Sequence, residues 1–328
     1  MWTRALSGAA PKLGAALFVP LAVLLLAGQP MGARLVPNDL VARGKHGVVV
    51  SQEPHATAVG LEVLRSGGNA VDAAVAVALT LAVTFPQAGN LGGGGFLVLR
   101  RPDGHVSTID FRERAPASAT RDMYLSPDGS VDNDKVQVGV TAAGVPGSPA
   151  GLLYTLQKYG SKNLLELVKP AIRLAREGFV IDHRLASSLY AKRKVLGRFA
   201  STRAVFFDGD APRKQGEVLV QQDLANTLQR FGEGGMSGFY DGPTADLIVA
   251  HMEQAGGFVS RDDLKAYESR EREALSVDYR GYEVISMGPP SSGGVAMMQM
   301  LNMLRPYDLK SLEYGSSEYI HLLTEVMR

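Results

Sequence analysis

The segment "AVDAAVAVALTLAV", residues 70–83, limits the folds open to this 328-residue chain more than any other segment. It is apolar nearly all round, so a helix formed by it has no face suited to water. Asn69 precedes it as a helix cap, and Asp72 follows three residues later. The run is too short to cross a bilayer, which takes about 20 apolar residues. We therefore expect a helix buried between the layers of a domain.

The residues after this segment predict a change from helix to strand. Pro86 ends the helix, and a glycine run follows. "GFLVLR" and "HVSTIDF", separated by "PDG", have the pattern of a hairpin, and "LSVDYRGYEVISM" predicts a second one. A short strand is expected in "HGVVVSQ", and a series of helices from residue 147 onward. Since there is no internal repeat or long linker, a single α/β unit is predicted.

Four consecutive glycines, Gly92 to Gly95, suggest a phosphate-binding loop that the neighbouring residues exclude. No lysine and hydroxyl residue follow them, and Leu97 stands where the dinucleotide pattern requires a third glycine. Phosphates bind where a strand leads into a helix N-terminus, whereas this run leads from a helix into a strand. Taken alone, the run predicts a turn with positive φ and close backbone approach, or a wall against which a ligand lies.

Composition excludes several classes of function. The chain is 45% hydrophobic and 20% charged with net charge +1, which implies neither a nucleic acid nor another charged polymer as a partner. It has no cysteine, so disulfides, thiol nucleophiles and thiolate metal sites are excluded. Its six histidines are scattered without the spacing of metal ligands. We expect neither a metal nor a cofactor.

Residues 1–33 have the pattern of an export signal. Arg4 and Lys12 precede the apolar run "LGAALFVPLAVLLLAG", and small residues near Ala33 suit a cleavage site. A membrane anchor is the alternative, but the run is short for a span and contains Pro20. We therefore expect an exported, periplasmic or secreted protein without stable membrane insertion once the signal is removed.

The motif "DFRERAP" places Arg112, Glu113 and Arg114 at the end of a predicted strand. Alternation along an extended chain puts the two arginines on one face and Glu113 on the other. An arginine fork holds a carboxylate in two parallel hydrogen bonds, a charged pairing that contributes roughly 1.5–3 kcal/mol. Taken alone, the local residues favour a solvated cluster of surface charges.

Serine hydrolase patterns fail on inspection. "GVPGSPAG" has Pro146 where the G-x-S-x-G pattern requires glycine, and "GGMSGFY" has Phe239 where the last glycine belongs. In "PPSSGG", Ser291 and Ser292 are expected to cap the helix that follows.

Helix caps also account for the paired acids. Asp262 and Asp263 follow a serine and suit the positive first turn of a helix better than acid/base catalysis. In "SSEYIHLLTEVMR", Ser317 is predicted to cap a last helix, with Ile320 and Met327 on one face. No stop signal follows this helix, so we expect the chain to be part of a longer protein.

Together, the motifs resemble the γ-glutamyltranspeptidase family, also called glutathione hydrolase proenzymes. The resemblance rests on "GVVVSQEPHATAVGLEVLRSGGNAVDAAVAVALTLAVTFPQAGNLGGGGFLVLR", "IDFRERAPASATRDMYL", "GVPGSPAGL", "GFVSRDDLKAY" and "PPSSGG", which occur in the family's order. It covers nearly the whole chain after the signal, so residues 34–328 are interpreted as a large-subunit portion without the small subunit.

The resemblance implies an N-terminal nucleophile hydrolase fold, an α/β (α+β) four-layer αββα sandwich that is incomplete here. In the family, one precursor cuts itself into a large and a small subunit. The enzyme transfers the γ-glutamyl group of glutathione and related compounds to water, an amino acid or a dipeptide. With the resemblance, Arg112 is expected to bind the α-carboxylate of the γ-glutamyl group, and the glycine run becomes a packing corner for the hairpin that leads to it.

The family's nucleophile is a threonine that opens a "TTH"-like motif of the small subunit. Self-cleavage frees its α-amino group, which acts as base for its own hydroxyl. No two threonines are adjacent in this sequence, and Thr324 lies inside a helical pattern. No catalytic residue is therefore assigned within the chain, and the chain alone is expected to be inactive.

Two alternatives remain open at this point. A glutaryl or cephalosporin acylase shares the expected fold but acts on a different acyl group. A non-enzymatic exported binding protein would never have had a small subunit. Comparing the turnover of glutathione with that of glutaryl substrates distinguishes the acylase from a γ-glutamyltranspeptidase. A downstream coding sequence that contains the threonine motif would exclude the binding protein.

Overall fold

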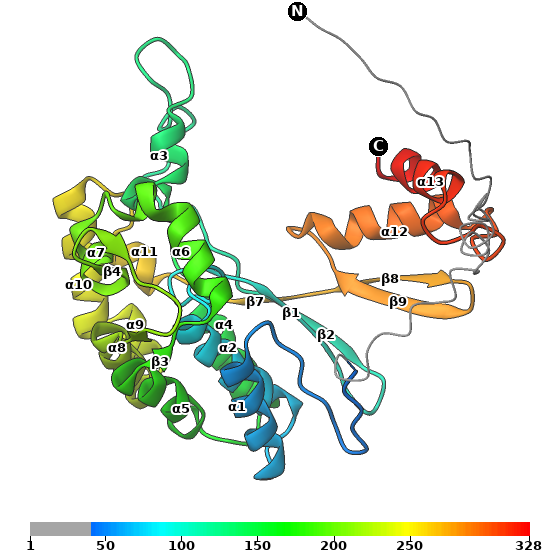
Figure 1. The fold of residues 1–328 in the computed structure, drawn as a ribbon, viewed down its shortest axis with the longest axis horizontal. Helices are drawn as coiled ribbons and strands as arrows, with labels where there is room; N and C mark the ends of the chain where they lie inside the picture. The colour runs from blue at the N-terminus through cyan, green and yellow to red at the C-terminus, as the bar shows by residue number, and fades with distance from the viewer. Residues whose placement is uncertain (1–40) are drawn as a thin grey trace, which may run out of the picture. The chain divides into compact units, whose positions relative to one another are not determined.

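The structure, a computed structural model, describes residues 41–328, and the chain divides into two units between Val48 and Val49. The predicted signal peptide, residues 1–33, lies outside the described residues. The unit from Val49 to Arg328 contains the helices and strands of Figure 1. Its helices are α1 (Pro54–Arg65), α2 (Ala70–Thr84), α3 (Asn133–Gln137), the 3-10 helix η2 (Val140–Ala142), α4 (Ser148–Tyr159), α5 (Leu164–Glu177), α6 (His183–Leu196), α7 (Ala200–Phe206), α8 (Gln222–Gly234), α9 (Met236–Tyr240), α10 (Gly242–Ala255), α11 (Arg261–Lys265), α12 (Ser292–Leu304) and α13 (Ser317–Met327).

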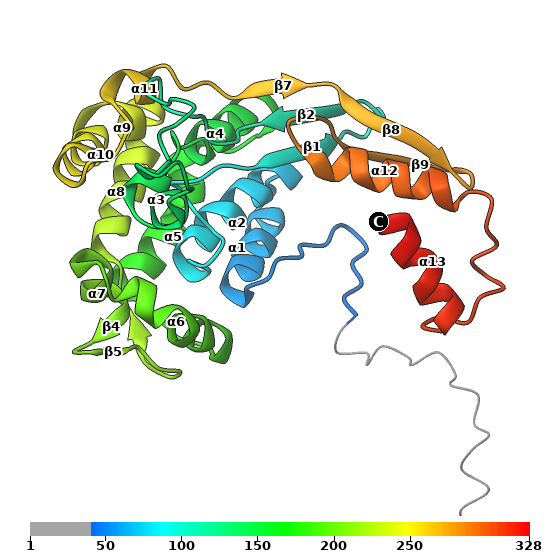
Figure 2. The ribbon, with the colours of Figure 1, turned by 90° about the horizontal axis from the view of Figure 1, so that it is seen from above.

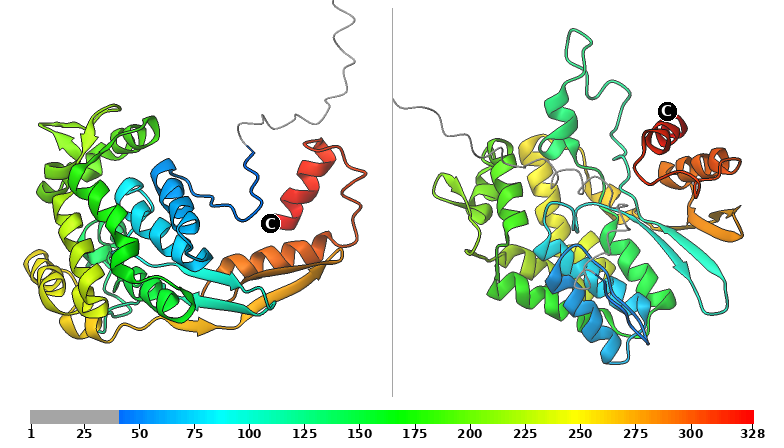
Figure 3. Two further views of the ribbon diagram at one scale, coloured as in Figure 1. Left: turned by 90° about the horizontal axis from the view of Figure 1, so that it is seen from below. Right: turned by 45° about the vertical axis from the view of Figure 1, so that its right-hand side comes forward.

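The main sheet has three antiparallel strands in the order β1-β2-β7. Both predicted hairpins are confirmed, as β1–β2 and as β8–β9, and α12 runs along the second one (Figures 2 and 3). Two short ribbons, β3–β6 and β4–β5, complete the set. The strands are β1 (Phe96–Arg100), β2 (Val106–Asp110), β3 (Phe179–Val180), β4 (Phe207–Asp208), β5 (Ala211–Pro212), β6 (Val218–Leu219), β7 (Arg270–Arg272), β8 (Ala274–Tyr279) and β9 (Tyr282–Met287).

Strand β7 joins the sheet through backbone pairing rather than through an apolar face. Its three residues are charged and exposed, so the sequence has no hydrophobic alternation that would predict a strand here. It pairs with β2, with Thr108 opposite Arg272, and the Thr108 hydroxyl donates to the Arg272 carbonyl at 2.6 Å. Its middle residue is tied to α4, where Lys158 Nζ lies 2.7 Å from Glu271 Oε1. These contacts bring a charged segment alongside the end of β2.

Helix α2 lies in the core, as the apolar segment predicts. Most of its residues are buried, and Val75, Leu79 and Val83 are fully so. It packs against α1, α4 and α5, and its alanines keep the neighbouring helices close because they add little volume. Burial on several sides explains why a helix without an amphipathic stripe is stable here.

The N-terminus of α2 is fixed by the predicted cap and by a buried carboxylate. The Asn69 side chain accepts hydrogen bonds from the amides of Val71 and Asp72, and the Asp72 carboxylate accepts one from the Asn69 amide. The Asp72 carboxylate also accepts from the Ser161 hydroxyl and from the amides of Ser161 and Lys162, at 2.6–3.0 Å. Burial alone would raise the pKa of Asp72, but these bonds outweigh it and lower the pKa. One carboxylate thus joins α2 to the loop between α4 and α5.

Three local predictions need correction. No strand forms in residues 46–52, because no described strand pairs with them, and Val50 is 85% exposed. A strand needs a partner for its backbone, which alternation alone does not provide. The last helix is capped by Ser316, one residue before the predicted Ser317, and Ser291 occupies the N-cap of α12 without a side-chain bond. The predicted cap of α11 is confirmed, with Ser260 and Asp263 bonding reciprocally.

Within residues 41–328, every helix is either too short or too polar to cross a bilayer.

The contribution of the buried Asp72 carboxylate to stability can be measured by removing it. Asp72→Ala leaves four donors unpaired in or near the core, so we expect a loss of about 3 kcal/mol in the free energy of unfolding. Asp262→Ala is the matched control, because Asp262 occupies the exposed first turn of α11. It should cost less than about 1 kcal/mol. Urea denaturation followed by circular dichroism measures both, and equal losses would contradict the assignment.

The lowered pKa of Asp72 predicts an acid-dependent stability. The ionised group is favoured in the folded state, so its contribution is complete above its unfolded pKa of about 3.9 and disappears as pH falls through the lower folded value. The difference in unfolding free energy between the wild type and Asp72→Asn should therefore be constant above about pH 5 and shrink as pH falls from about 5 to about 2. Urea titrations across that range measure it, and a pH-independent difference would refute the explanation.

Candidate functional site

Arg112 lies two residues beyond β2, at a small polar cavity of about 190 Å³. We call this cavity the arginine pocket. Its walls come from the end of β2, from the segment that contains β7, and from the loop before α12: Asp110, Arg112, Glu113, Arg114, Tyr267, Arg270, Arg272 and Pro290. The pocket therefore combines segments separated by more than 150 residues in sequence.

The glycine run positions this segment by close backbone contact. A Cβ on Gly94 would lie 2.5 Å from the Phe111 carbonyl oxygen and 2.7 Å from the Glu113 nitrogen. A Cβ on Gly95 would lie 2.8 Å from the Phe111 ring, and the backbones of Gly95 and Phe111 exchange two hydrogen bonds at 3.1 and 3.3 Å. The packing-corner prediction is confirmed. The prediction of positive φ is wrong, because none of Gly92 to Gly95 has it; small size is what the position requires.

Asp110 holds the start of the segment. Its Oδ1 accepts from the Arg112 amide at 3.1 Å, and its Oδ2 accepts from Nε and Nη2 of Arg272 at 3.0 and 2.8 Å. The Asp110 side chain is only 11% exposed, which strengthens this two-pronged ion pair. The carboxylate thereby ties the backbone of Arg112 to β7.

Tyr267 holds the other side of the same residue. Its hydroxyl donates to the Arg112 carbonyl at 2.8 Å, and its ring carries the Arg114 guanidinium at 5.0 Å from the centroid. Burial, aided by the carboxylates of Asp110 and Glu113, raises the pKa of Tyr267 to about 12, although Arg114 opposes the shift. The hydroxyl therefore stays protonated and able to donate throughout the physiological pH range.

The Arg112 side chain is exposed, and its hydrogen bond within the described residues runs from Nη1 to the Pro290 carbonyl at 3.3 Å. Arg114 lines the same pocket, as the alternation predicts, but its Nη2 donates to the Glu268 carbonyl. Glu113 also lines the pocket, which the alternation does not predict, because the segment leaves the regular strand after Asp110.

Charge in the pocket favours an anion. Four guanidinium groups and two carboxylates contribute to its walls, and one of those carboxylates is already paired with Arg272. The exposed fork of Arg112 can bind a small carboxylate through two parallel hydrogen bonds. Within residues 41–328, no group of three or more potential ligands could hold a metal ion.

Hydroxyl candidates elsewhere are engaged in structural bonds. Ser148 is 5% exposed and its hydroxyl donates to Asn90 Oδ1 at 2.6 Å. The Ser237 hydroxyl donates to the Gly234 carbonyl at the end of α8, and the Thr324 hydroxyl donates to the Ile320 carbonyl within α13. None of these bonds joins a hydroxyl to a basic side chain, the arrangement that activates a serine or threonine.

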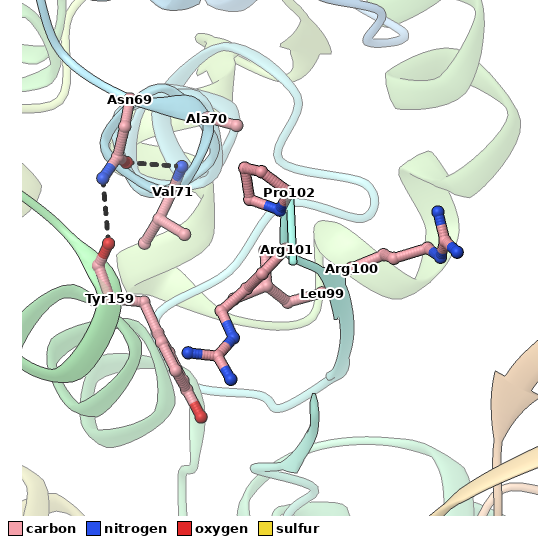
Figure 4. Close-up of a pocket in the computed structure, with 8 residues that line it drawn as sticks. All are labelled: Asn69, Ala70, Val71, Leu99, Arg100, Arg101, Pro102 and Tyr159. Atoms are coloured by element: carbon pink, nitrogen blue, oxygen red, sulfur yellow. Dashed lines mark hydrogen bonds between the residues drawn. The ribbon is translucent and has the colours of Figure 1, made fainter. Parts of the chain in front are cut away.

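A larger cavity of about 580 Å³ lies at the N-terminus of α2, with walls from the end of β1 and from Tyr159 (Figure 4). Asn69 bonds both to the Val71 amide and to the Tyr159 carbonyl there, at 2.8 and 2.9 Å. Since the Asn69 cap already occupies the amides of Val71 and Asp72, the cavity does not offer these two amides to an anion. Arg112 is not among its lining residues.

Local sequence patterns missed five members of the arginine pocket: Asp110, Tyr267, Arg270, Arg272 and Pro290. Asp110 and Tyr267 lie within the quoted motifs "IDFRERAP" and "RDDLKAY", but a motif does not reveal that they meet. The Tyr267 bond spans 155 residues and the Arg272 ion pair spans 162.

Comparisons with known proteins agree on one family. The sequence model described as Gamma-glutamyltranspeptidase matches residues 56–328. The chain is 46% identical over 284 residues to the glutathione hydrolase proenzyme of Escherichia coli (strain K12), which covers 86% of this chain and 49% of that protein. It is 36% identical over 294 residues to the acylase ACY 1 proenzyme of Pseudomonas sp. (strain V22), covering 88% and 52%. The chain thus spans about half the length of these curated relatives.

Among solved structures, the chain is similar to the Helicobacter pylori γ-glutamyltranspeptidase. The TM-score is 0.86 at 43% identity, and the match covers 88% of this chain and 82% of that one. Similarity at this level confirms the predicted fold class, the N-terminal nucleophile hydrolase fold, of which the described helices and strands form a part.

The contact of Gly94 with the Arg112 segment predicts a sharp difference between neighbouring glycines. In Gly94→Ala, the new methyl group meets backbone atoms that cannot rotate away, so we expect a loss of about 2 kcal/mol in stability. Amide hydrogen exchange in residues 111–114 should also become faster. Gly92→Ala is the control, because nothing lies within 4 Å of its Cβ position. Equal exchange in the two variants would contradict the role of the glycine run.

Proposed function

Because this chain belongs to the γ-glutamyltranspeptidase family, we propose that it is the large-subunit portion of an enzyme that transfers or hydrolyses γ-glutamyl groups. Its substrates would be glutathione and other γ-glutamyl compounds, and its acceptors water, amino acids or dipeptides. The small subunit, made from the same precursor, would be its partner. No cofactor is required by this chemistry.

The arginine pocket supports the proposal most directly. A γ-glutamyl group carries a free α-carboxylate, and Arg112 offers an exposed guanidinium in a pocket with a surplus of positive charge. Two parallel charged hydrogen bonds fix both the position and the orientation of such a carboxylate. The γ-carbonyl, at the other end of the group, is then directed away from Arg112 toward the nucleophile.

The nucleophile of the proposed reaction is the threonine of the family's small-subunit motif, which these 328 residues do not contain. Its hydroxyl attacks the γ-carbonyl carbon while its freed α-amino group takes the proton. The bond from that carbon to the amide nitrogen breaks, and the leaving amine receives the proton. Water or an acceptor amine then attacks the acyl-enzyme and releases glutamate or a new γ-glutamyl compound. Backbone amides stabilise the oxyanion in both steps.

Export to the periplasm or the medium is part of the proposal. It rests on the pattern of residues 1–33, which includes the two basic residues, the apolar run and the small residues near Ala33. Cell fractionation with an antibody against the chain would test it, and a purely cytoplasmic product would refute it.

The acylase alternative has a specific observation in its favour, the 36% identity to an acylase proenzyme, although the identity to the glutathione hydrolase proenzyme is higher. A glutaryl group has the same terminal carboxylate but lacks the α-amino group, so Arg112 alone does not discriminate between them. Turnover rates measured in parallel on glutathione and on a glutaryl amide discriminate between the two functions. Faster turnover of the glutaryl substrate would replace the proposed function.

The central residue of the proposal is tested by Arg112→Lys in the protein expressed with its downstream coding sequence. Lysine keeps the charge but loses the fork, so KM for a γ-glutamyl anilide should rise about tenfold to a hundredfold. Self-cleavage into two subunits should continue. Arg121→Lys is the control, since that side chain is 96% exposed and outside the pocket. Unchanged KM in Arg112→Lys would remove Arg112 from the site.

A further inference from the structure

We propose that Tyr267 is a positioning residue for substrate binding, which acts by fixing the backbone of Arg112. This inference rests on the proposed function, because it concerns how Arg112 is presented to the carboxylate. Tyr267 itself would not touch the substrate. Its hydroxyl binds the main-chain carbonyl of Arg112, at 2.8 Å, and not the guanidinium.

Backbone hydrogen bonds hold the chain on both sides of Arg112. Phe111 pairs with Gly95, and Arg114 pairs with Val145 through two bonds at 2.8 and 3.2 Å. The Arg112 amide is taken by Asp110. Among the described residues, only the Tyr267 hydroxyl donates a hydrogen bond to the Arg112 carbonyl. Removing this hydroxyl leaves the Arg112 carbonyl without its hydrogen-bond partner.

Tyr267 is itself rigid, which is what a positioning residue requires. Its side chain is 2% exposed, and its ring stacks on Tyr240 with centroids 5.7 Å apart and planes at 9°. The Tyr240 hydroxyl donates to the Pro146 carbonyl at 2.8 Å. A Cβ on Gly147 would lie 2.3 Å from the Tyr267 hydroxyl, so this glycine leaves the space that the hydroxyl occupies.

The stack also connects both sides of the Arg112 segment. Tyr240 holds Pro146, whose neighbour Val145 pairs with Arg114, while Tyr267 holds Arg112 directly and carries Arg114 on its ring. The exposed guanidinium of Arg112 therefore extends from a main chain fixed by buried aromatic rings. Less conformational freedom remains to be lost when a carboxylate binds, and this favours affinity.

The experiment uses Tyr267→Phe, which removes one oxygen and keeps the ring stack. In the protein expressed with its downstream coding sequence, KM for a γ-glutamyl anilide should rise about fivefold to tenfold, with kcat within about twofold of the wild type. The matched control is Tyr124→Phe, which removes a similar hydroxyl-to-carbonyl bond, to Thr141 at 2.9 Å, outside the arginine pocket. Its KM should stay within about twofold of the wild type.

A double mutant separates positioning from a general loss of stability. If Tyr267 acts through the arginine fork, Tyr267→Phe should change KM by less than about twofold in the Arg112→Lys background. The loss of thermal stability should be the same in both backgrounds. The proposal would be overturned if the rise in KM of the double mutant equalled the product of the rises in the two single mutants. It would also be overturned if Tyr267→Phe lowered kcat and left KM unchanged.

Hydrogen exchange of the 328-residue chain distinguishes this proposal from the proposed function. Residues 111–114 should exchange faster in Tyr267→Phe and unchanged in Tyr124→Phe. Faster exchange, together with no γ-glutamyl turnover by the wild-type protein expressed with its downstream coding sequence, would refute the proposed function while supporting the fixation of the backbone. Unchanged exchange, or turnover with unchanged KM in Tyr267→Phe, would refute the role of Tyr267.

Discussion

The close contact between Gly94, Gly95 and the main chain of Phe111 to Glu113 is the constraint on which the rest of the site depends. Any Cβ at Gly94 would overlap backbone atoms, so the two segments reach their present distance only because both glycines lack a side chain. This contact extends the β1–β2 pairing by one residue and carries the chain to Arg112 at the mouth of the arginine pocket. The glycines thus shape the site without touching a ligand.

Around that contact, buried polar groups convert an exposed arginine into a fixed binding group. Asp110 links the Arg112 amide to β7, and the Tyr267 hydroxyl donates a hydrogen bond to the Arg112 carbonyl. The cost of burying these groups is offset because each has a partner with good geometry. The charge that remains unpaired in the pocket is mainly positive, and this is the electrostatic basis for binding a carboxylate.

Sequence predicted the parts of the fold that depend on local pattern. The apolar run of α2, its Asn69 cap and both hairpins follow from periodicity and turn residues. Strand β7 was missed because its three charged residues have no apolar alternation, and the strand expected in residues 46–52 was wrong because pairing depends on a partner. Arg112 was found through its motif and the family resemblance, whereas Tyr267 was not, since its bond closes a loop of 155 residues.

In the proposed function, the Arg112 guanidinium holds the α-carboxylate of a γ-glutamyl group. The most direct measurement is a crystal structure of the protein, expressed with its downstream coding sequence, in complex with L-glutamate. We expect two parallel hydrogen bonds of about 2.7–2.9 Å between the α-carboxylate oxygens and Arg112, with Tyr267 still bonded to the Arg112 carbonyl. A carboxylate bound to Arg270 or Arg114 instead, with Arg112 turned away, would contradict it.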